Sequence, residues 1–217
     1  MRRSALCPLP SALCALLLLA LPASAVTVDR IAAVVDRQVL TVSEITQLVE
    51  IRFSPRLART DDEHRREVLD ALIAQALRYR DVERFGAEDV SHDAIDARIQ
   101  EIKRRFASEA EFNAALGRAE LTIEEVQALV KRQLQVESYI QERFAPLVFV
   151  SPEEIEEYYR GPWAQQRRER SLPVTPLNDE VRDEIRNLLR STRLQAEIDK
   201  WTAQLRERAN VDVYAAR

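Results

Sequence analysis

The sequence predicts a mainly α-helical fold with a small β-sheet. The chain has 217 residues but only three glycines, and so few glycines disfavour a turn-rich all-β fold. Apolar residues recur at three- and four-residue spacing over several long stretches, which is the period of an amphipathic helix. Strand-like segments lie near the two ends of the chain, at 28–40 and 211–214. We therefore expect long helices joined by short connections, with a small sheet formed by an N-terminal hairpin and the C-terminal strand.

The first 25 residues are typical of a cleaved secretory signal peptide. Two arginines precede an apolar run over residues 12–21, and a small-residue cleavage signal ends at Ala25. The run is about half of the ~20 residues that cross a membrane, so we expect no membrane anchor. Both cysteines, Cys7 and Cys14, lie in this segment. The exported chain would then have no thiol for a disulfide or a zinc site.

A β-hairpin and a capped helix are expected to follow. β-Branched residues over 28–40 flank the pair Asp36-Arg37, which is a poor two-residue turn but lies where a hairpin needs one. Thr41 and Glu44 have the spacing of a capping box. This spacing predicts a short helix directly after the hairpin.

The strongest helical pattern lies in residues 61–85. Asp61 or Asp62 is expected to cap this helix, and Gly86 to end it. Its apolar positions are Val68, Leu69, Leu72, Ile73, Ala76, Leu77 and Phe85. Their spacing of three and four predicts one buried face along the whole helix.

Four further helices are expected, each opened by a serine or threonine. The expected caps are Ser91, Ser108, Thr122 and Ser151. The last three have a glutamate three positions later, as in a capping box. The three glycines, Gly86, Gly117 and Gly161, each lie where a helix is expected to stop.

Residues 162–176 interrupt the helical pattern. They contain three prolines and little periodic apolar content, so we expect a solvated linker. Asn178 is expected to cap a last helix that runs to about Ala209, before the strand at 211–214. Since an isolated hairpin is marginally stable, we expect this strand to complete the sheet. The chain then forms one folded unit with a frayed insert.

The sequence carries no recognisable pattern for catalysis or for metal or cofactor binding. His64 and His92 have no mutual spacing that suits either task, and both are expected on the surface. Nucleophile-elbow, zinc-protease, Walker and dinucleotide-binding motifs do not occur. Without the signal segment the chain has 30 basic and 36 acidic residues, which disfavours nucleic acid as a partner. We therefore expect no enzyme, no catalytic residue, no cofactor and no metal.

Aromatic and apolar side chains remain as candidates for a surface that binds polypeptide. The candidates are Phe106, Phe112, Leu116, Tyr139, Phe144, Tyr158, Tyr159 and Trp163. For each of the first five, a place in the core is the favoured alternative. The last three lie near a short helix that offers little core for three large rings, which suggests an exposed binding edge beside a place in the core.

Six segments, taken in order, carry a resemblance to a known family. They are VDRIAAVVDRQVLTVSEI, LDALIAQALRYRDVERFG, VSHDAIDARI, VSPEEIEEYY, PLNDEVRDEIRNLL and WTAQLRERANVDVY. In this order of elements the chain resembles the SurA-like periplasmic chaperones. The resemblance implies a helical chaperone core at 26–160, after the signal peptide at 1–25, that residues 178–217 complete. It also implies a periplasmic, ATP-independent holdase for unfolded or extended outer-membrane and secreted polypeptides.

Members of this family place parvulin-type prolyl isomerase domains where this chain has a linker at 161–177. That interval is too short for a domain, and 162–177 contains no His, Cys or Asp, so we expect no isomerase activity. Two alternatives stay open: a dedicated assembly or scaffold subunit that binds one folded partner, and a peptidyl-prolyl cis-trans isomerase. A homodimer formed by exchange of the C-terminal helix also stays open.

Overall fold

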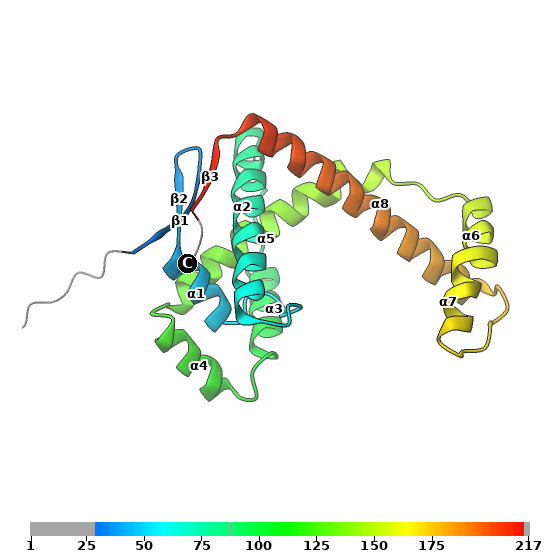
Figure 1. Cartoon of the computed structure of the whole chain (residues 1–217), viewed down its shortest axis with the longest axis horizontal. Helices are drawn as coiled ribbons and strands as arrows, with labels where there is room; N and C mark the ends of the chain where they lie inside the picture. The colour runs from blue at the N-terminus through cyan, green and yellow to red at the C-terminus, as the bar shows by residue number, and fades with distance from the viewer. Residues whose placement is uncertain (1–28, 87, 215–217) are drawn as a thin grey trace, which may run out of the picture.

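The computed structural model describes residues 29–86 and 88–214 (Figure 1). The expected signal peptide and its cleavage site after Ala25 lie outside this part of the chain. The described residues form a helical body with a small sheet at one side, and a long C-terminal helix that reaches to a second, smaller group of helices (Figure 1).

The sheet joins the two ends of the described chain. β1 (Ile31–Val35) lies between β2 (Gln38–Thr41) and β3 (Val211–Val213), and both pairings are antiparallel. Val34 is opposite Val39 on one side and Asp212 on the other. The prediction that the hairpin and the C-terminal strand form one sheet is therefore confirmed.

The C-terminal segment also supports the unusual hairpin turn. Asp36 has a positive φ of 53°, which is uncommon for a residue other than glycine. Its N–H donates to the carbonyl of Asn210 at 2.7 Å, and its Oδ1 accepts from the Asn210 N–H at 2.8 Å. These two bonds offset the conformational cost of the Asp36-Arg37 turn, so the hairpin depends on the far end of the chain.

The helices follow the predicted order, with caps that the sequence indicates. The α-helices are α1 (Val42–Glu50), α2 (Asp61–Phe85), α3 (His92–Lys103), α4 (Glu109–Arg118), α5 (Ile123–Arg143), α6 (Pro152–Tyr158), α7 (Ala164–Glu169) and α8 (Asp179–Arg208). A short 3₁₀ turn, η1 (Ala145–Leu147), follows α5, and a π-helical turn, η2 (Tyr159–Trp163), joins α6 to α7. Capping boxes at Thr41, Thr122 and Ser151 are confirmed.

The cap of α2 differs from the prediction. Thr60 is the N-cap: its hydroxyl accepts from the Glu63 N–H at 3.2 Å, and the Glu63 carboxylate accepts from the Thr60 N–H at 3.1 Å. Asp61 and Asp62 lie in the first turn instead, where the positive end of the helix dipole favours carboxylates. The prediction of Asp61 or Asp62 as the cap was wrong because Thr60 completes a capping box.

Two of the three glycines do not end a helix. α4 continues through Gly117 to Arg118, and Glu120, with φ of 53°, takes the left-handed position instead. The Leu121 N–H then reaches back to the Leu116 carbonyl at 3.0 Å, as in a Schellman motif. Gly161 lies inside η2, and among the three only Gly86, with φ of 95°, ends a helix as predicted.

The region expected to be a solvated linker is partly helical. Helical structure continues from α6 through η2 into α7, and Trp163 and Ala164 are buried. The wider π turn accommodates Pro162, which has no N–H for an α-helical hydrogen bond. Residues 172–178 do lack regular structure, so the linker is shorter than expected.

Two separate hydrophobic clusters hold the described chain together. The main core lies between the sheet and helices α1 to α5, together with the C-terminal half of α8. Its largest fully buried side chains are Phe112, Leu40, Ile51, Ile73, Leu77, Ile102, Val82, Val126 and Val130. The second cluster, which we call the distal lobe, consists of α6, η2, α7 and the N-terminal half of α8. Figure 1 shows α8 as the element that spans from one to the other.

Candidate functional site

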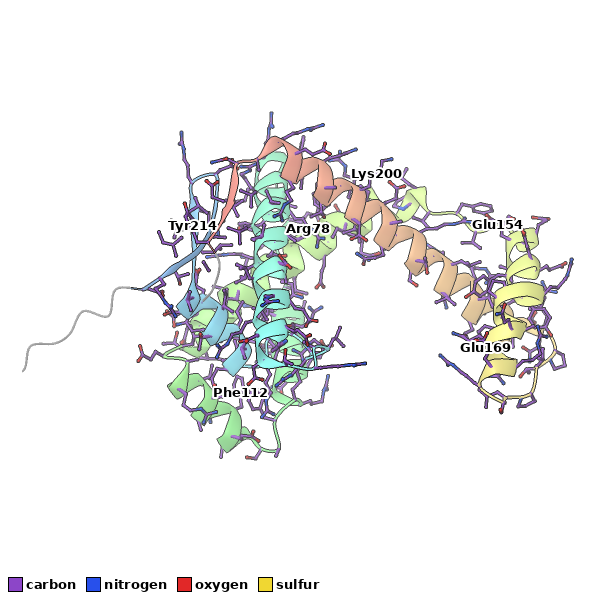
Figure 2. All side chains as sticks on the ribbon, in the orientation of Figure 1. Arg78, Phe112, Glu154, Glu169, Lys200 and Tyr214 are labelled. Carbon is purple, nitrogen blue, oxygen red and sulfur yellow. The ribbon has the colours of Figure 1, made fainter. Side chains whose placement is uncertain are left out.

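The eight predicted peptide-binding residues lie in three places that are not adjacent in the fold. Phe106, Phe112 and Leu116 belong to the main core around α3 and α4. Tyr139 and Phe144 lie near the end of α5, and Tyr158, Tyr159 and Trp163 belong to the distal lobe. Figure 2 labels Phe112 in the main core and Glu154 and Glu169 in the distal lobe, at opposite ends of the molecule.

The first group packs as core. Phe106 and Phe112 are buried and meet edge to face, with their ring centroids 5.5 Å apart. The Arg52 guanidinium covers the Phe106 ring at 4.3 Å and also binds Glu111 at 2.8 Å. These contacts leave little aromatic surface for a client in this conformation, and a peptide-binding role of these residues stays a prediction.

The second group attaches α8 to the main core. Trp201 of α8 lies with its ring 5.5 Å from Tyr139 and 5.2 Å from Phe144. Its indole N–H donates to Asp81 of α2 at 3.1 Å. The next residue, Thr202, accepts a 2.8 Å hydrogen bond from Arg78 of α2. Aromatic stacking and polar contacts therefore fix α8 against both α2 and α5. Exchange of this helix between two copies stays a prediction.

The third group forms much of the distal lobe. Trp163 is buried, and Tyr158 and Tyr159 are half-buried beside it. The remaining fully buried members are Val150, Ile155, Val181 and Ile185. The N-terminal half of α8 therefore covers much of these aromatic rings, for which the sequence suggested an exposed edge. The sequence analysis did not predict that this part of α8 packs against them.

A more exposed apolar pair, which the sequence analysis did not select, lies at the end of η1 and just beyond it. Leu147 and Phe149 have 71% and 72% of their surface exposed, whereas Val148 and Val150 between and after them are buried. This alternation is typical of an extended segment with one buried face. The sequence did contain a signal for this exposure, because residues 147–150 are four consecutive apolar residues between two helices. An extended segment with one buried face needs an apolar side chain only at every second position.

Two pockets lie on the main core. One, of about 220 Å³, has an aliphatic floor of Leu48, Leu72, Leu121 and Leu129, with charged residues such as Glu44, Glu125 and Arg132 at its margin. The other, of about 430 Å³, lies between the hairpin turn and α2, and Tyr79, Arg80 and Glu83 are among the residues that line it. The first is suited to an apolar side chain, because its floor is aliphatic.

Two titratable groups in the described part of the chain, His64 and Glu88, have unusual surroundings. His92 is exposed, but His64 is buried, with its Nδ1 lacking a hydrogen-bond partner among the described residues, so the prediction of a surface position was wrong for His64. A hydrogen bond and charge repulsion between two carboxylates raise the pKa of Glu88 beside Glu142, but neither residue lines the two pockets. Within residues 29–86 and 88–214, no group of three potential metal ligands occurs.

The Arg193–Glu154 ion pair ties α8 to α6, and Arg193 also binds the segment that precedes α6. Arg193 donates to the Phe149 carbonyl and to both carboxylate oxygens of Glu154. The hydrogen bonds from Arg193, and after them one from the Ser151 N–H, hold the pKa of Glu154 below its ordinary value. The hydrogen bonds to Glu154 in turn raise the pKa of Arg193. The pair thus fixes the place where the main core passes into the distal lobe.

Comparison with known proteins gives one relationship to report. No protein-family model matches the chain. Over 150 residues the chain is 27% identical to Chaperone SurA from Saccharophagus degradans. This supports a SurA-like relationship. The matched region is 66% of this chain but 34% of that protein, so the chain spans about a third of the length of this relative. None of the helices in the described part is both long and apolar enough to cross a membrane.

Proposed function

We propose that the chain is an exported chaperone that holds unfolded outer-membrane or secreted polypeptides without ATP or a cofactor. The similarity to a SurA chaperone over two thirds of the chain is the observation that carries this proposal. The fold supports it, because four of the six segments that carry the resemblance meet in the main core, which the C-terminal half of α8 and β3 complete. The periplasm is the compartment that this role implies.

The described part of the chain has exposed apolar surface of the kind that a holdase requires. Leu147 and Phe149 are exposed, and the aliphatic pocket between α1, α2 and α5 is open to an apolar side chain. Neither feature presents a charge pattern that would select one client. Several weak apolar contacts of this kind suit binding to many unfolded chains, because each contact can be made by a different client residue.

Suppression of aggregation tests this function directly. An unfolded outer-membrane β-barrel protein is diluted from denaturant without ATP, and light scattering is recorded with the mature protein in several-fold molar excess. We expect scattering to fall as the protein is added. Unchanged scattering at that excess would contradict the proposal. Capture of a single folded partner in place of unfolded clients would support an assembly subunit instead.

A matched pair of variants locates the surface that acts. The double substitution Leu147→Ser and Phe149→Ser removes exposed apolar area and is expected to weaken suppression without a loss of folding. Leu57→Ser is the control, since Leu57 is 86% exposed on the loop between α1 and α2. Equal activity of both variants and the unmodified chain would exclude Leu147 and Phe149 from the binding surface.

We also propose that the chain does not catalyse prolyl isomerisation. Residues 162–177 offer no His, Cys or Asp for such a site. In refolding of a protein limited by a proline isomerisation step, the mature chain should leave the slow rate unchanged. Acceleration that increases with chain concentration would contradict this.

A further inference from the structure

An irregular segment of the chain lies along the distal lobe and is held there by its backbone. The Nε and Nη2 of Arg167 both donate to the Pro173 carbonyl at 3.0 Å. The Tyr159 hydroxyl donates to the Thr175 carbonyl at 2.8 Å. Alternate carbonyls of the segment are therefore bound by side chains of η2 and α7.

The Thr175 hydroxyl also accepts a hydrogen bond from Arg167 Nη2 at 3.3 Å, but the other side chains of residues 172–176 are exposed. Leu172 and Val174 are exposed, and Pro173 and Pro176 are exposed as well. The two prolines fix their own φ and bias Leu172 and Thr175 toward extended backbone, which favours a polyproline II-type conformation. Another extended, proline-containing segment could make the same carbonyl contacts, because they do not depend on the exposed side chains.

The lobe also contains a buried donor without an acceptor. Trp163 is only 6% exposed, and its indole N–H has no hydrogen-bond partner among the described residues. The Arg167 guanidinium lies 5.9 Å from the centre of the same ring. Polyproline II-type peptides dock in grooves lined by aromatic residues. Tyr159, Trp163 and Arg167 lie together in this lobe, beside the segment that carries the two prolines.

We propose that the distal lobe is a binding site for extended, proline-containing segments of other polypeptides, and that residues 172–176 occupy it in cis and block it. This site is separate from the aliphatic pocket and the Leu147 and Phe149 surface of the proposed holdase function. Occupation is reversible because it consists of a few hydrogen bonds, and no covalent step is involved. The tether places the blocking segment at roughly millimolar effective concentration, so a free peptide competes poorly against it.

A peptide titration of the full mature chain tests the proposal. The probe is a fluorescent peptide with the sequence SLPVTPL, which is that of residues 171–177. A loop variant with Pro173→Gly, Thr175→Gly and Pro176→Gly keeps the length of the connection but loses the preformed conformation. We expect the variant to bind the probe at least about ten-fold more tightly than the unmodified chain, because the tethered competitor is weakened. A probe with glycine in place of both prolines is the matched control and should bind more weakly.

Two further substitutions identify the site. In the loop-variant background, Tyr159→Phe together with Arg167→Gln should abolish probe binding, since the two carbonyl contacts are lost. Amide exchange at Ile185, which is fully buried in this lobe, checks that the lobe stays folded. Probe binding that is unchanged by the two substitutions would overturn the proposal, and so would a loop variant that has Tyr159 and Arg167 and a protected lobe but does not bind the probe.

A third measurement covers a loop variant that fails to fold. The unmodified chain is then titrated with the peptide to several millimolar while the Trp163 indole N–H signal is followed by NMR. A saturable shift supports the site, and no shift overturns it. Dimerisation of the unmodified chain through exchange of residues 172–176 would also overturn occupation in cis. The peptide-binding measurements decide only the proposed site in the distal lobe. The holdase function is decided by the aggregation assay, so either proposal can fail while the other holds.

Discussion

The two halves of α8 pack against clusters of very different size. The C-terminal half, with Trp201 and Leu205, completes a core that extends through the sheet and five helices. The N-terminal half contributes Val181 and Ile185 to a cluster that has five buried residues in the described part of the chain. Since a small cluster buries little apolar surface, its stability is marginal by itself. One continuous helix therefore belongs to a stable region at its C-terminal end and to a marginally stable region at its N-terminal end.

This difference predicts that the distal lobe opens before the main core does. Local unfolding is easiest where buried contacts are few and backbone groups are exposed. The lobe can loosen or change its occupant while Trp201 keeps the rest of α8 in place. The comparison makes three predictions, which differ in the size and the location of the effect.

The largest effect is expected for Trp201→Ala. The substitution removes a buried ring that contacts Tyr139 and Phe144, and it leaves Asp81 without its indole donor. We expect a loss of about 3–5 kcal/mol of unfolding free energy, measured by urea denaturation. Trp201→Phe is the matched control: it keeps an aromatic ring and should lose clearly less. A loss below about 1 kcal/mol for Trp201→Ala would show that α8 is not part of the main core.

A smaller and local effect is expected for Ile185→Ala. Ile185 is fully buried. Truncation of such a residue costs about 2–5 kcal/mol of unfolding free energy when its region unfolds together with the rest of the protein. We expect faster amide exchange in α6, α7 and the first half of α8, with a small change in the midpoint of the main urea transition. Leu188→Ala, one turn further along the same helix at an exposed position, should change neither. An equal loss of protection in both regions would contradict the separation of the two clusters.

The smallest effect is expected from acid on the Arg193–Glu154 pair. Because the hydrogen bond from Arg193 depresses the pKa of Glu154, its stabilising contribution is present above the ordinary value of about 4.3 and is lost as the pH falls through the lower value of the folded chain. The protection of distal-lobe amides against hydrogen exchange should therefore decrease below about pH 4. Arg193→Gln should raise exchange at neutral pH and reduce this additional acid response. An unchanged acid response in the variant would rule out this pair as its source.

Most helix starts, and the pairing of the strands, follow from local sequence rules or from general limits of stability. Thr41, Thr122 and Ser151 each predict a helix start because a capping box is a contact within four residues. The pairing of the C-terminal strand with the hairpin was also predictable, since a two-stranded hairpin alone is marginally stable. The capping boxes depend on contacts between residues close in sequence. The strand pairing depends on the low stability of an isolated hairpin.

The features that were missed depend on contacts between distant residues. Trp163 appeared to lack a core because its cover, Val181 and Ile185, belongs to a helix beyond the prolines. The Asp36-Arg37 turn appeared poor because Asn210, which supports it, lies 174 residues further along the chain. The exposure of Leu147 and Phe149 also required the fold, because the sequence shows four apolar residues in a row without a polar side.

The central claim is that α8 and β3 complete the main core. Its most direct test is a full chain with a specific protease site inserted between Ser171 and Val174, which is cut after folding. We predict that the two fragments elute together in size-exclusion chromatography and unfold in one transition. If the fragment that contains α8 separates, and the remainder unfolds at the midpoint of the intact chain, the claim is contradicted.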